Sequence, residues 1–131
     1  MDINSRDPDG YTPGDVIERI IRTVNEGTYG IDYTVRPGNK EQKLREDYIV
    51  DDKKIADILC SLDTKDWIEY QMSTEKGHEK DIVHFFAKDC KLMPRLIEEA
   101  EEEIVRLYIK VTWAKPINRL FIISFHEYGL F

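Results

Sequence analysis

A strictly alternating stretch near the C-terminus most constrains the fold of this chain of 131 residues. Between Val105 and Trp113 every odd-numbered residue is apolar, and every even-numbered residue is Arg, Tyr, Lys or Thr. Successive side chains of a β-strand point to opposite faces, so this pattern predicts a half-buried strand with one polar face. The next stretch, Arg119 to Tyr128, is rich in β-branched and aromatic residues, which is typical of a more central strand. The short connection with Pro and Asn between them predicts an antiparallel hairpin.

This hairpin would gather four polar side chains on one surface of the sheet. Tyr108 and Lys110 of its first strand would face Ser124 and His126 of its second. An imidazole titrates near neutral pH and can move protons in the cleavage of a phosphodiester, which makes His126 a candidate acid or base. The alternative is a histidine at a strand end that is hydrogen-bonded to a neighbour, and position alone does not separate the two interpretations.

The rest of the chain places helices before strands. Thr12 and Asp15 form a capping-box pattern ahead of an apolar stripe of helical period, which predicts a helix over 13–26 behind a flexible lead at 1–11. The remaining patterns predict an extended segment at 29–36, a short polar helix at 39–45, an amphipathic helix from 51 or 52 to 62, strands at 67–72 and 81–87, and a helix or charged connection at 91–103. This order predicts one α+β domain over 1–131, with the helices packed on a small antiparallel sheet.

Composition narrows the class of protein. No apolar run is long enough to span a membrane and no signal-peptide pattern is present, so we expect a cytoplasmic protein. Cys60 and Cys90 are too few for a disulfide framework, and no metal-site spacing joins them to the three histidines. The net charge of −7 argues against nucleic-acid binding. The excess is local, however: five glutamates lie between Glu98 and Glu103, whereas from Ile104 onward four basic residues stand against one glutamate.

Further candidates each have a structural alternative. Tyr108 could donate to a phosphate or stack on a base, and Lys110 could neutralise a phosphate, but both residue types are common on the wet side of a strand. His84 could complete an acid/base pair if it faced His126, or could be a satisfied core histidine. Glu69 could act as a base, or be a plain exposed glutamate. The candidate RNA-binding cations are Arg36, Lys80, Arg106 and Arg119.

The order of these parts resembles that of a known family. Tyr108-Ile109-Lys110-Val111, the hairpin and Ile122 to Glu127 resemble the last strands of MqsR-type toxins, which run Tyr-Leu-Lys-Ile and end Val-Ser-Phe-Lys-Glu. The likeness extends upstream through Val24 to Gly27, Thr64 to Trp67 and Met72. It implies a RelE-like fold and a metal-free, cofactor-free endoribonuclease that cleaves single-stranded mRNA and is neutralised by a cognate antitoxin.

Only part of the family's catalytic set has a match in this sequence. Tyr108 and Lys110 match the family pattern, and His126 stands where the family has lysine. The family's lysine before Ser-Met is lost near Tyr70 or Gln71, and its glutamine falls near Lys80. We therefore expect Tyr108, Lys110 and His126 as catalytic residues, and His84 as a fourth if it faces His126.

Two other classes of function remain open. The chain could be a non-catalytic RNA- or protein-binding module on the same fold. It could also be a structural subunit that docks a basic partner through Glu98 to Glu103.

Overall fold

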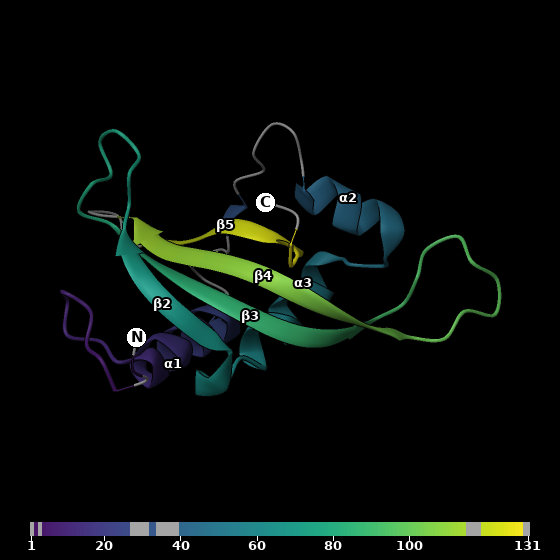
Figure 1. Ribbon diagram of the computed structural model, residues 1–131, viewed down its shortest axis with the longest axis horizontal. Helices are drawn as coiled ribbons and strands as arrows, with labels where there is room; N and C mark the ends of the chain where they lie inside the picture. Colours follow the sequence, from purple (N-terminus) through teal and green to yellow (C-terminus); the bar gives the residue numbers. More distant parts are fainter. Residues whose placement is uncertain (1, 3, 27–31, 34–39, 115–118, 130–131) are drawn as a thin grey trace.

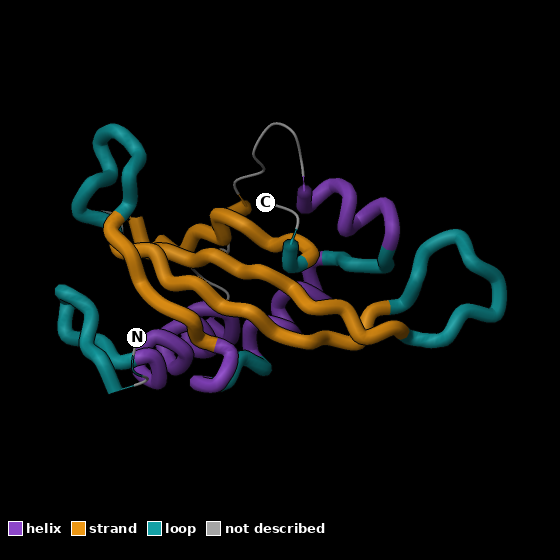
Figure 2. Tube along the Cα trace, viewed as in Figure 1, coloured by secondary structure: helices purple, strands orange, loops and turns teal. Residues whose placement is uncertain are grey.

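The structure, a computed structural model, describes residues 2, 4–26, 32–33, 40–114 and 119–129. It has an α+β fold in which helices pack on one face of a twisted sheet, as the sequence predicts (Figure 1, Figure 2). Four strands of the sheet pair antiparallel with their neighbours, and a fifth, very short strand is parallel to the strand beside it.

Local capping fixes the starts of two helices. In α1 (Pro13–Glu26) the Thr12 hydroxyl accepts a hydrogen bond from the Asp15 N–H at 3.2 Å, and the Asp15 carboxylate accepts one from the Thr12 N–H at 3.0 Å. The bounds of α1 agree with the predicted helix. In α3 (Asp52–Cys60) the side chain of Asp51 accepts from the Lys54 N–H at 2.8 Å. None of the helices in the described part of the chain combines the length and apolar character needed to cross a membrane.

Two shorter helical elements complete the helical part. The predicted polar helix is α2 (Lys40–Asp47), and it contributes one buried residue, Leu44. A 3-10 turn, η1 (Thr64–Asp66), leads into the strand that begins at Trp67.

The sheet has the strand order β1-β5-β4-β3-β2. Its strands are β1 (Asp32–Tyr33), β2 (Trp67–Met72), β3 (Ile82–Leu92), β4 (Glu103–Ala114) and β5 (Arg119–Glu127). The predicted strand at 67–72 and the predicted hairpin strands are confirmed. The rest of the expected extended segment at 29–36, outside β1, lies outside the described residues.

The strand predicted at 81–87 is longer than expected. β3 continues to Leu92, and a loop over 93–102 joins it to β4 (Figure 2). The helix considered for 91–103 is therefore wrong, and the charged connection is correct. Like charges three and four positions apart destabilise a helix, which disfavours one through Glu98–Glu103. The β3–β4 ladder instead extends to the pair Leu92 and Glu103.

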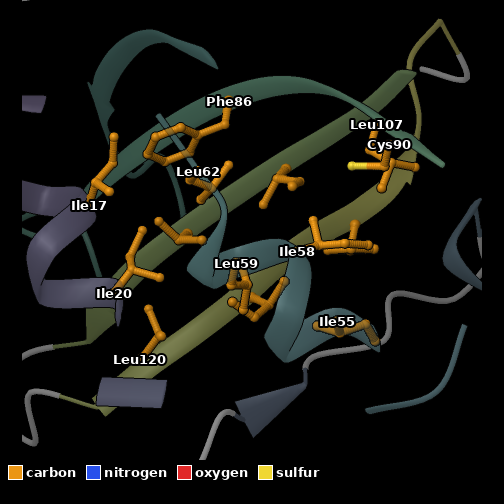
Figure 3. Packing of buried hydrophobic residues seen from close by; sticks show 14 of the residues in the cluster. Ile17, Ile20, Ile55, Ile58, Leu59, Leu62, Phe86, Cys90, Leu107 and Leu120 are labelled. Carbon is orange, nitrogen blue, oxygen red and sulfur yellow. The ribbon is translucent and has the colours of Figure 1, made fainter. Parts of the chain in front are cut away.

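The core lies between the helices and one face of the sheet. The five odd-numbered apolar residues from Val105 to Trp113 are all buried, as the alternation predicts. Figure 3 shows Ile17 and Ile20 of α1 and Leu59 of α3 packed toward the sheet. This layer leaves the opposite face of the sheet, here called the outer face, for the even-numbered residues of β4.

The N-terminal segment is anchored, contrary to the flexible lead expected at 1–11. The Asp7 carboxylate is buried and accepts hydrogen bonds from the N–H groups of Asp9 (2.9 Å) and Tyr11 (3.0 Å). Its second oxygen lies 3.0 Å from Nε2 of His84 in β3. A buried carboxylate with three donors fixes this segment against the sheet.

Candidate functional site

Strand pairing brings the predicted polar residues together on the outer face. Tyr108 is opposite His126 and Lys110 is opposite Ser124 in the antiparallel β4–β5 ladder, as the sequence predicts. The ring centroids of Tyr108 and His126 are 5.4 Å apart. A phenol, an ammonium, a hydroxyl and an imidazole therefore share one surface.

A β-bulge in β5 sets this arrangement. Lys110 is paired with Ser124 and Val111 with Ile122, which leaves Ile123 as an extra residue in the ladder. Uninterrupted alternation from Ile122 would send Phe125 to the outer face and His126 into the core. The extra residue shifts the alternation of side chains by one position. Phe125 is therefore buried opposite Ile109, and His126 is on the outer face.

Tyr108 is the centre of an aromatic cluster on this face. The Lys110 ammonium lies 5.5 Å from the centroid of the Tyr108 ring and 5.2 Å from that of Phe85. The Phe85 and Tyr128 rings are 6.1 and 5.9 Å from that of Tyr108. Burial, and then the negative charge of Glu69 and the neighbouring Tyr128, raise the pKa of Tyr108 above its ordinary value. The phenol therefore stays protonated at neutral pH and acts as a hydrogen-bond donor.

His126 is held in one orientation by the backbone beside it. Its Nδ1 lies 2.9 Å from the carbonyl oxygen of Glu127. A carbonyl oxygen only accepts hydrogen bonds, so Nδ1 carries the hydrogen, and in the neutral ring the lone pair is on Nε2. Nε2 is thus the atom at which this ring takes up a proton, although the side chain lies close to Tyr108 and the residue is only 5% exposed.

His84 is on the opposite face of the sheet. It is paired with Val111, a core residue, and it is buried. Its Nδ1 accepts from the indole N–H of Trp67 at 3.2 Å, and its Nε2 donates to Asp7. Burial lowers the pKa of His84, against the opposing effect of Asp7, which keeps the ring neutral. The hypothesis that His84 faces His126 is therefore wrong, and the alternative of a satisfied core histidine is the observed one.

One of the four predicted RNA-binding cations joins this cluster. The Arg106 side chain is 62% exposed on the outer face, 4.0 Å from Asp89, and its guanidinium lies 5.2 Å from the Tyr128 ring centroid. Lys80 and Arg119 are exposed, but they lie near the other end of the sheet, before β3 and at the start of β5. Arg119 is seven residues from His126, or about 20 Å along a strand. Arg36 lies outside the described residues.

Three further residues belong to this surface. Glu69 is paired with Phe85, and Phe85 with Lys110, so β2 and β3 extend the row of outer-face side chains. Tyr128 follows the end of β5, where its N–H donates to the Arg106 carbonyl at 2.7 Å. The sequence offered no signal for Phe85, because β3 is apolar on both faces and only the register assigns a side.

No cluster of three or more His, Cys, Asp or Glu side chains that could hold a metal ion is found within the residues that the structure describes. Comparison of the chain with protein-family models, with curated proteins and with solved structures gives no match. The chemistry of the outer face is therefore the basis for assigning a function.

Proposed function

We propose that the protein is a metal-independent endoribonuclease that cleaves single-stranded mRNA on its outer face and acts in the cytoplasm as the toxin of a toxin–antitoxin pair. The observation that carries this proposal is the grouping of Tyr108, Lys110 and His126 on two paired strands, with ring contacts of 5.4 and 5.5 Å around Tyr108. The resemblance to MqsR-type toxins in the last two strands supports the same assignment.

Cleavage without a metal needs proton transfer and charge stabilisation at phosphorus. Nε2 of His126 accepts the proton of the ribose 2′-hydroxyl as the 2′-oxygen bonds to phosphorus. The same proton then passes to the 5′-oxygen as the phosphorus–oxygen bond to it breaks. The Lys110 ammonium neutralises the charge that develops on the phosphate oxygens, and the Tyr108 phenol donates a hydrogen bond to one of them. His126 serves as both base and acid because His84 is on the other face.

The test is incubation of the purified protein with single-stranded RNA in EDTA. We expect cleavage, and we expect His126→Ala and Lys110→Ala to slow it by roughly 10²–10⁴-fold, the usual effect of removing a positioned proton-transfer or charge-stabilising group. The matched controls are His78→Ala in the exposed β2–β3 loop and Lys91→Ala, near the end of β3, which should cleave like the wild type. Cleavage that persists undiminished in His126→Ala would remove the assignment.

A second candidate is a non-catalytic RNA-binding module on the same fold. The low exposure of His126 favours it, because the more accessible groups of this face, Arg106, Lys110 and Tyr108, are suited to binding. Such a module would retain RNA without cutting it, and His126→Ala would leave its affinity unchanged. Induced expression separates the two, since a nuclease arrests the growth of its host and co-expression of a cognate antitoxin restores it.

A further inference from the structure

We propose that Tyr128, held by Arg106, is a stacking platform for one nucleobase of a single-stranded RNA whose neighbouring phosphate contacts Lys110. This inference rests on the proposed RNA-directed function, and it adds a base-binding subsite outside the group of residues assigned to cleavage.

Three contacts position Tyr128. Its backbone N–H donates to the Arg106 carbonyl at 2.7 Å and so continues the β4–β5 pairing by one residue beyond the strand. The guanidinium of Arg106 lies over the ring, 5.2 Å from its centroid. The ring also meets that of Tyr108 edge to face, at 5.9 Å and 74°. A ring positioned in this way loses little conformational freedom when a ligand binds to it.

The ring is nevertheless accessible. Tyr128 is 46% exposed, whereas most aromatic residues of the sheet are buried or half-buried. Unpaired bases in RNA stack on exposed aromatic rings and on guanidinium planes, and Tyr128 and Arg106 supply one of each. Arg106 also places a positive charge 5.2 Å from the ring centroid, close to where the backbone of a stacked nucleotide would pass.

The position of the platform relates it to Lys110. Tyr108 touches both groups, with its ring centroid 5.5 Å from the Lys110 ammonium and 5.9 Å from the Tyr128 ring. One ring therefore separates the phosphate-binding ammonium from the platform, which suits a phosphate and a base of nearby nucleotides. A base inside a duplex is already stacked on its neighbours, so this subsite selects single strands.

The experiment measures binding of a short fluorescein-labelled RNA in which every ribose is 2′-O-methylated, so that no 2′-hydroxyl is left to attack. Fluorescence anisotropy at one fixed salt concentration gives the Kd for the wild type, Tyr128→Leu and Tyr128→Phe. We expect Tyr128→Leu to bind roughly 5- to 100-fold more weakly, and Tyr128→Phe, which keeps the ring, to bind like the wild type. Leu96→Ala, which removes an exposed apolar side chain from the β3–β4 loop, is the control and should bind normally.

A scan with one abasic ribose at each position of the same RNA tests stacking directly. One abasic position should weaken binding to the wild type and have no further effect on Tyr128→Leu, because the two changes remove the same contact. An abasic scan that is flat for the wild type, or a Tyr128→Phe variant as weak as Tyr128→Leu, would overturn the platform while leaving RNA cleavage in place. A wild type that neither binds nor cuts RNA would overturn both proposals.

Discussion

The buried Asp7 carboxylate makes a quantitative prediction about stability. The indole N–H of Trp67 can only donate, so Nδ1 of His84 must accept from it, and Nε2 must carry the hydrogen that is donated to Asp7. The other Asp7 oxygen accepts from the N–H groups of Asp9 and Tyr11. The structure therefore requires an acceptor at both ends of this side chain.

Asp7→Asn preserves the shape of the side chain but supplies only one acceptor. Whichever way the amide is turned, its NH₂ group faces a donor: Nε2–H of His84 or the two backbone N–H groups. A buried polar group left unsatisfied costs about 1–3 kcal/mol, so we expect a loss of about 2 kcal/mol in the free energy of unfolding. Asp7→Ala leaves all three donors without this partner and should cost about 3–5 kcal/mol.

Urea unfolding followed by tryptophan fluorescence measures these losses, with an unchanged m-value as the check on two-state behaviour. For a chain of this length, 2 kcal/mol corresponds to a fall in Tm of about 7 °C. Asp9→Asn, at an exposed position two residues away, is the control and should change stability little. If Asp7→Asn unfolded at the wild-type urea concentration, the buried relay from Asp7 through His84 to Trp67 would be refuted.

Two further predictions concern buried charge. Burial lowers the pKa of His84 in the folded state below its ordinary value of 6.5, so the unfolded chain binds more protons, and stability should fall as the pH drops from about 7 through 6.5. His84→Phe should make this slope shallower in urea titrations between about pH 7.5 and 5.5, and an unchanged slope would contradict the assignment. Lys88 lies 3.2 Å from Asp66, and both side chains are largely buried. Lys88→Ala should therefore cost roughly 1–3 kcal/mol, and a double-mutant cycle with Asp66→Asn that gave no coupling energy would show that the pair contributes nothing.

The features that the sequence predicts well each depend on a few consecutive residues. The alternation from Val105 to Trp113 defines the two faces of β4, and the Thr12–Asp15 cap defines the start of α1. The pairing of Tyr108 with His126, by contrast, depends on the bulge at Ile123, which no sequence pattern signals. The two faces of β4 and the start of α1 are set by neighbouring residues, so predicting them needs no knowledge of distant contacts.

Two of the failures depend on pairing between distant segments. Val83, Phe85 and Phe86 of β3 are all buried although they point to different faces, so alternation cannot tell which side His84 occupies. Only the register with Val111 of β4 assigns it to the core.

The role of Asp7, near the start of the chain, also depends on a distant partner. It is one acidic residue in a polar stretch, and its partner is 77 positions further along. No property of residues 1–11 alone distinguishes an anchored carboxylate from a solvated one.

A second bulge, in β2, has a consequence for how separate copies of the protein meet. β2 is the last strand on its side of the sheet, and an outermost strand offers its backbone as a template for strands of other molecules. Here the strand has only six residues, and Ile68 interrupts its ladder between Trp67 and Glu69. Such an irregularity bends and twists the strand, so a straight incoming strand finds few consecutive hydrogen-bonding partners. The same irregularity that fits β2 to β3 therefore protects the molecule against edge-to-edge aggregation.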